Sequence, residues 1–247
     1  MNTSNDNISV AYGDAFMALT DAVSEGDTLK IREHAKKTLD CAKVLELPYL
    51  EVAVLCMAAT GFLIARQLPT VLKLYDEAVK IANEAITNET DRGLYEQLSV
   101  QVLLYKGTAL LIQKPPQYEA ISEVYQVAAD KLHQMIAAKG QIEAVDWTSG
   151  GILHIYLFDA LRILGYCQEQ QGRNQAALKH YIKAVNAAEK IAPDIRKTTT
   201  LNVVGQALLD LCRKLSMKNE YFTVIDKMNG LLGLGWDKPV PKANRKD

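Results

Sequence analysis

The chain contains few of the residues that interrupt helices or favour sheets. Its 247 residues include 7 prolines and 14 glycines, and only 7% of them are aromatic. A many-stranded β fold needs frequent turns and is enriched in aromatic side chains, so this composition argues against one. Because 49% of the residues are hydrophobic, the chain can still build one large core or an array of repeats.

The usual signals of metal sites and catalysis are also absent. There are four cysteines and four histidines, without a CxxC pair and without a histidine at ligand spacing. No GxxxxGK[ST], GxGxxG or GxSxG sequence occurs, so the common phosphate loops and nucleophile elbows are missing. We therefore expect no enzyme, no metal and no cofactor. The cysteines are interpreted as small buried hydrophobes in a reducing compartment.

Neither net charge nor hydropathy indicates nucleic acid or membrane as a partner. The formal net charge is −1, with 28 basic and 29 acidic residues, so no general attraction to polyanions is expected. The longest apolar stretch, residues 50–65, is shorter than the roughly 18–20 residues that a membrane span needs. The N-terminus does not resemble a secretory signal. We therefore expect no nucleic acid binding, no membrane insertion and a cytoplasmic location.

Hydrophobic side chains recur at helical spacing along most of the chain. Leu178, Tyr181 and Val185 lie on one face of a helix, and the preceding stripe ends at Gly172. Gly172 is suited to the left-handed conformation that ends a helix, and Asn174 to capping the next one. The segment is therefore predicted to be a helical hairpin.

The same reading along the chain predicts ten helices in five antiparallel pairs. They are expected at residues 10–24, 27–45, 49–66, 70–87, 90–113, 117–138, 150–171, 174–192, 195–215 and 219–231. One repeat domain would then cover residues 10–231, with a disordered N-terminus at 1–9 and an extended or disordered tail at 232–247. Residues 139–151 are predicted to form a loop.

A small or aromatic residue repeats at the same place in successive second helices. Ala35, Tyr75, Tyr125 and Tyr181 follow one another at intervals of 40, 50 and 56 residues. In the three tyrosine-containing helices, an alanine follows the tyrosine after three residues. Such a period indicates a repeat array with lengthened helices and an insertion.

The best-defined repeat, residues 158–193, resembles the tetratricopeptide (TPR) family. The large, small and turn residues that carry the resemblance are Leu161, Leu164, Gly165, Gly172, Ala177, Tyr181 and Ala184. Its second helix is about one turn longer than the family's, similar to the repeats of kinesin light chains and soluble NSF-attachment proteins. The resemblance implies an all-α, right-handed superhelical solenoid of about five hairpins.

In that family the first helix of each pair lines a concave groove. Carried onto this sequence, the resemblance implies a polar groove segment at Asp159, Arg162, Tyr166, Glu169 and Gln170. It implies an apolar groove segment at Ala53, Cys56, Thr60, Leu63 and Ile64. We expect such a groove to hold a peptide or helix of a protein partner. The clamp that some TPR co-chaperones use for a C-terminal carboxylate is not supported, since these positions offer an arginine but no asparagine.

Three functions therefore remain open from the sequence. The first is a protein–protein interaction module, acting as an adaptor, a scaffold or a chaperone subunit. The second is a sensor whose groove binds a small ligand or signalling peptide, with a pocket near residues 139–151. The third is an all-helical enzyme without a recognisable motif. A homodimer that buries Cys56, Leu63 and Ile64 is a further possibility.

Overall fold

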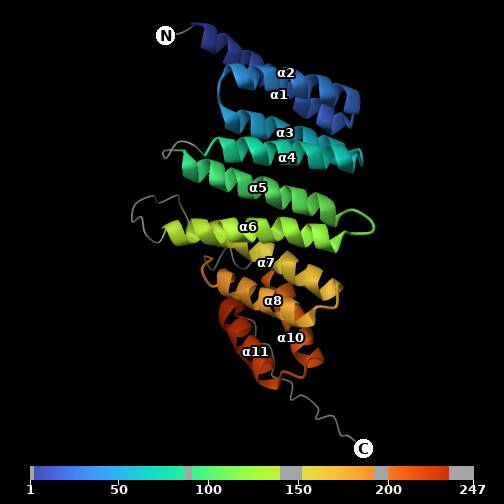
Figure 1. Ribbon diagram of the computed structural model, residues 1–247, viewed down its shortest axis with the longest axis vertical. Helices are drawn as coiled ribbons and strands as arrows, with labels where there is room; N and C mark the ends of the chain where they lie inside the picture. Colours follow the sequence, from blue (N-terminus) through green and yellow to red (C-terminus); the bar gives the residue numbers. More distant parts are fainter. Residues whose placement is uncertain (1–2, 87–90, 140–151, 192–199, 234–247) are drawn as a thin grey trace, which may run out of the picture. The chain divides into compact units, whose positions relative to one another are not determined.

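The structure is a computed structural model and describes residues 3–86, 91–139, 152–191 and 200–233. Ten α-helices and no β-strand occur in these ranges (Figure 1). The helices are α1 (Thr3–Glu25), α2 (Thr28–Val44), α3 (Pro48–Ile64), α4 (Leu68–Glu84), α5 (Arg92–Leu111), α6 (Tyr118–Lys139), α7 (Ile152–Gln170), α8 (Asn174–Ala188), α10 (Leu201–Lys214) and α11 (Lys218–Leu232).

The predicted all-α fold is confirmed, and most helix boundaries agree within about two residues. The N-terminus differs: α1 begins at Thr3, although residues 1–9 were expected to be disordered. Residues 7–10 of α1 are exposed or half-buried, so the buried apolar stripe starts later than the helix. Residues 140–151 of the expected loop, residues 195–199 of an expected helix and residues 234–247 of the expected tail lie outside the described residues.

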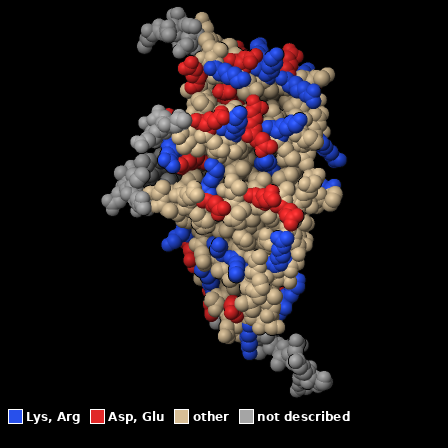
Figure 2. Space-filling model, viewed as in Figure 1, with Lys and Arg blue, Asp and Glu red and all other residues tan. Residues whose placement is uncertain are grey.

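Tertiary contacts divide the chain into two compact units, Met1–Val127 (unit 1) and Ala128–Asp247 (unit 2). In unit 1, α1 packs on α2 and α3 on α4, α2 and α4 pack on the first helix of the next hairpin, and α3 also contacts α1 and α5. The first helices of the hairpins therefore form one layer of unit 1, with α2 and α4 behind them. In unit 2, α7 packs on α8, α8 on α10, and α10 on α11. On the face shown in Figure 2, acidic and basic side chains are interspersed over the N-terminal helices.

The second helices of the first four hairpins bury residues at the same four positions, which are the fourth, eighth, eleventh and fifteenth. These positions form the 3.6-residue stripe that faces the first-helix layer. The buried residues are Ile31, Ala35, Thr38 and Ala42 in α2; Val71, Tyr75, Ala78 and Ala82 in α4; Ile121, Tyr125, Ala128 and Leu132 in α6; and Ala177, Tyr181, Ala184 and Ala188 in α8. The predicted equivalence of Ala35 with the three tyrosines is thus confirmed.

Glycine on the first helix makes room for the tyrosine on the second. A Cβ atom added at Gly165 would lie 2.6 Å from two ring carbons of Tyr181, and one added at Gly107 would collide with the ring of Tyr125. The two helices therefore approach closely in the α5–α6 and α7–α8 hairpins.

Four hairpin turns share one geometry. Each turn contains one residue with positive φ: Gly26 between α1 and α2, Arg66 between α3 and α4, Gly172 between α7 and α8, and Ser216 between α10 and α11. In each case the amide of the next residue donates to a carbonyl five positions earlier, the bond that closes a Schellman-type helix end. Gly172 at φ 72° confirms the predicted turn. The expected cap at Asn174 is wrong: in this turn the residue that follows the positive-φ glycine is the capping residue, as Asp27 is for α2. For α8 that residue is Arg173, which makes no side-chain capping hydrogen bond.

Candidate functional site

The α3 stripe consists of Ala53, Cys56, Thr60, Leu63 and Ile64, the predicted apolar groove segment. All five side chains are exposed or half-buried, and Ile64 is 61% exposed. Helix α3 packs on α2 and α4 with one face and touches α1 and α5 along its sides. The α3 stripe therefore lies on the remaining face of the helix, which is open to solvent.

A threonine–tyrosine pair lies at the centre of the α3 stripe. The Thr60 hydroxyl donates to the carbonyl oxygen of Cys56 over 3.0 Å and is hydrogen-bonded to Tyr75 of α4. Burial raises the pKa of Tyr75 to about 12 and that of the Cys56 thiol to about 12. A thiol with such a pKa stays protonated and is a poor nucleophile, so Cys56 contributes an apolar surface.

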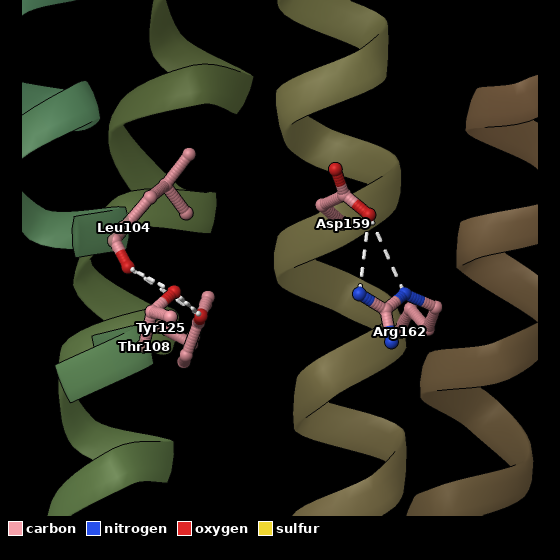
Figure 3. A network of polar contacts seen from close by, with 5 residues as sticks. All are labelled: Leu104, Thr108, Tyr125, Asp159 and Arg162. Atoms are coloured by element: carbon pink, nitrogen blue, oxygen red, sulfur yellow. Dashed lines mark hydrogen bonds and ion pairs between the residues drawn. The ribbon is translucent and has the colours of Figure 1, made fainter. Parts of the chain in front are cut away.

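The next first helix repeats this arrangement. The Thr108 hydroxyl donates to the carbonyl oxygen of Leu104 over 2.9 Å and lies 3.1 Å from the Tyr125 hydroxyl (Figure 3). Leu111 is half-buried and Ile112 is 58% exposed. Together with Gln101, these positions form the α5 stripe: Gln101, Leu104, Thr108, Leu111 and Ile112.

Sequence reasoning did not identify the α5 stripe. Tyr75 follows Thr60 by 15 residues, whereas Tyr125 follows Thr108 by 17, because the break after α5 is longer. A short repeat within the sequence could have identified it: in both places a threonine is followed by a leucine three residues later and an isoleucine four residues later. The α3 and α5 stripes together contain no charged residue, and α3 contacts α5. They form one uncharged, largely apolar face of unit 1.

The predicted polar segment on α7 lies in unit 2 and is engaged internally. The Arg162 guanidinium pairs with the Asp159 carboxylate at 3.3 Å (Figure 3). The Tyr181 hydroxyl donates to the Glu169 carboxylate over 3.0 Å. Burial raises the pKa of Asp159, while the guanidinium beside it acts in the opposite direction. Burial also raises the pKa of Tyr181, and the Glu169 carboxylate adds to this shift.

The other two residues of the α7 segment are exposed to solvent, namely Tyr166 and Gln170. The following first helix, α10, carries an equivalent exposed set that the sequence reading did not name: Val203, Gln206, Asp210, Arg213 and Lys214. Within it, Arg213 pairs with Asp210 at 3.0 Å and donates to the Tyr221 hydroxyl over 2.7 Å. The exposed face of the first helices in unit 2 is therefore polar, in contrast to that of α3 and α5.

No metal-binding cluster was found in the described part of the chain: three or more His, Cys, Asp or Glu side chains do not come together there. No helix among the described ranges is long and apolar enough to cross a membrane.

Comparison with known proteins identifies a fold rather than a family. No protein-family model matches the chain, and no curated protein matches it. Among solved structures, the apo form of RapI is similar at a TM-score of 0.60 and 13% identity, over 90% of this chain and 70% of that one. BtubC (BKLC) from P. vanneervenii is similar at a TM-score of 0.51 and 12% identity, over 95% of both chains.

A Podosopora anserina protein with nearly identical TPR-like repeats is similar at a TM-score of 0.46 and 11% identity, over 92% of this chain and 95% of that one. A TM-score of 0.46 is too low to support a fold assignment by itself. The five hairpins, the glycine–tyrosine contacts and the two stronger similarities together confirm that the chain has a TPR-like helical-repeat fold.

Proposed function

We propose that this chain is a protein-interaction module that binds an extended or helical segment of a partner protein on the α3 and α5 stripes. The observation that carries the proposal is the repetition of one uncharged surface on two neighbouring first helices. Each copy offers a threonine hydroxyl held by a tyrosine and, at its end, an exposed isoleucine, Ile64 or Ile112. Repeat proteins use extended surfaces of this kind to bind their partners.

The chemistry of this surface favours a partner with apolar side chains at its contact points. Two isoleucines more than half exposed on adjacent helices are costly in water unless they are covered. Tyr105 of α5 is 52% exposed, and its ring centroid lies 6.4 Å from that of Tyr75. An exposed aromatic ring held beside a second ring is typical of residues that anchor interfaces.

Within this proposal the chain acts as an adaptor, scaffold or chaperone subunit, and the α7 segment has a secondary role. Arg162 already forms an ion pair with Asp159, and Glu169 already accepts a hydrogen bond from Tyr181. Orienting a partner through Arg162 and Glu169 would require breaking those contacts. Tyr166 and Gln170 are the members of that segment with exposed side chains. A cytoplasmic location agrees with the four cysteines, none of which forms a disulfide in the structure.

The test compares two pairs of substitutions. Ile64→Asp with Ile112→Asp places two carboxylates on the proposed surface. The matched control, Leu29→Asp with Val44→Asp, alters two residues at the ends of α2 that are 77% and 62% exposed. Val44 lies, like Ile64 and Ile112, at the C-terminal end of a helix, where a carboxylate is unfavourable, whereas Leu29 lies in a first turn, where it is favourable. The melting curve of each variant is therefore compared with that of wild type.

Partners captured from native lysate by the wild-type chain would be identified by mass spectrometry and their affinities measured with purified proteins. We expect the pair on α3 and α5 to weaken binding by at least about tenfold, since two buried isoleucines contribute about 1.5–3 kcal/mol each. The α2 pair should bind like wild type. Equal binding by both variants, with unchanged melting curves, would reject the α3 and α5 stripes as the binding surface.

A further inference from the structure

A row of lysines follows the outer face of α8. Lys179, Lys183 and Lys190 are exposed, with Asn186 between the last two. None of the three lysines forms an ion pair with another described residue. Like charges at i and i+4 on a helix repel each other, so this row, the α8 lysine row, is electrostatically unfavourable in the isolated chain.

A row of acidic residues follows the outer face of α6. Glu119, Glu123 and Asp130 are exposed, with Gln126 between the last two. On the face shown in Figure 2, acidic side chains gather over α6, and basic side chains gather over α8. We call the acidic set the α6 carboxylate row.

The two rows have the same spacing and opposite charge. Each has charged residues at relative positions 0, 4 and 11 and an amide side chain at position 7. A helix bearing one row can therefore lie parallel to a helix bearing the other, in the same chain direction, with three opposite-charge pairs and one amide pair. An apolar residue accompanies each row: Val127 on α6 is 48% exposed, and Ile182 on α8 is 39% exposed.

The distribution of charge along the chain agrees with this match. Residues 1–127 contain 17 acidic and 11 basic residues, a net charge of −6, and residues 128–247 contain 12 acidic and 17 basic residues, a net charge of +5. Because these values nearly cancel, to −1 for the whole chain, two copies approach without strong net repulsion, and the acidic half of one chain attracts the basic half of the other.

We propose that the α8 lysine row binds the α6 carboxylate row of a second copy of this chain. The contact uses the outer faces of second helices, so it leaves the α3 and α5 stripes available and does not depend on the proposed function. Exposed ion pairs contribute little individually, so the association is weak, with a dissociation constant between about 1 µM and about 1 mM. It weakens with salt, because the screening length falls from about 10 Å at about 0.1 M to about 3 Å at about 1 M.

A charge-swap experiment tests the pairing in the full chain. The first variant, Lys179→Glu with Lys183→Glu and Lys190→Glu, makes both rows acidic. The second variant, Glu119→Lys with Glu123→Lys and Asp130→Lys, makes both rows basic. Sedimentation equilibrium at low salt would be measured for each variant alone, for their equimolar mixture and for wild type.

We expect salt-sensitive self-association of wild type, at least about tenfold weaker association of each variant alone, and recovery in the mixture, where acidic rows again meet basic ones. The control Lys36→Glu with Lys37→Glu and Lys73→Glu changes three exposed lysines on α2 and α4 and should associate like wild type. A wild-type chain that remains monomeric would overturn the proposal. So would a mixture that does not recover while circular dichroism shows both variants folded.

Discussion

At the scale of single residues, two glycines of first helices lie against the aromatic rings of second helices. The Tyr181 ring occupies the space that a Cβ of Gly165 would need, and the Tyr125 ring does the same at Gly107. The tyrosine hydroxyls then reach polar groups of the first helix, Thr108 or Glu169. Because glycine has no Cβ, the tyrosine ring can be buried against it while the tyrosine hydroxyl keeps a hydrogen-bond partner.

This geometry predicts opposite effects for two glycine-to-alanine substitutions. Gly165→Ala should lower the free energy of unfolding by about 1–3 kcal/mol, since the Tyr181 ring must move from a packed core. Gly13→Ala should raise it by about 0.5–1 kcal/mol, because a Cβ at Gly13 meets nothing within 4 Å and alanine favours the helix. Urea denaturation of both variants checks the prediction. A stable Gly165→Ala would contradict the close approach.

At the scale of elements, the hairpin turn is preserved while its residue type is not. Gly172 takes positive φ as expected and Gly26 does so too, but Arg66 and Ser216 adopt it as well, at 59° and 57°. Residues with a Cβ pay about 1–2 kcal/mol for this conformation. The packing of the two helices on either side therefore outweighs the local preference of the turn residue.

Substitutions at two equivalent turns should consequently change stability in opposite directions. Gly172→Ala is expected to destabilise the fold by about 1 kcal/mol, because alanine at φ 72° is strained. Arg66→Gly is expected to stabilise it by up to about 1 kcal/mol, since glycine relieves the strain at some cost in chain entropy. Thermal unfolding measured on both variants provides the comparison. Equal shifts of the same sign would show that the turns are not equivalent.

At the scale of the whole molecule, each hairpin depends on its neighbours. Gly61 of α3 lies against Val23 and Ile31 of the preceding hairpin, and a Cβ there would come within 2.6 Å of Ile31. In such arrays stability is approximately a sum of hairpin and nearest-neighbour contributions. A defect at one junction should therefore have a limited range.

Hydrogen exchange can measure that range. In Gly61→Ala we expect amide protection to fall in α1–α4, whose junction is disturbed, and to remain unchanged in α10 and α11. Gly13 lies in the same unit, but a Cβ atom added there meets nothing within 4 Å. Gly13→Ala should therefore leave amide protection in α2–α4 unaltered. A uniform loss of protection across all helices would instead mean that the chain unfolds as one cooperative body.

The sequence by itself determined the fold class, because helical periodicity is local. The stripe around Tyr181, the break at Gly172 and the recurrence of Tyr75 and Tyr125 were sufficient to predict five hairpins of TPR type. It also located the α3 stripe on an exposed helix face. These features depend on residues a few positions apart, where spacing translates directly into geometry.

Only the tertiary structure decided which of the exposed groups are available. Arg162 and Glu169 are bonded inside unit 2, to Asp159 and Tyr181, and the α5 stripe lies beside α3 because those helices pack together. The Asp159–Arg162 pair lies at i, i+3 on one helix and follows from helical spacing. The Glu169–Tyr181 bond and the α3–α5 contact cannot be derived from spacing, since they join side chains of different helices. Local pattern determines which residues share a face, whereas packing determines what that face meets.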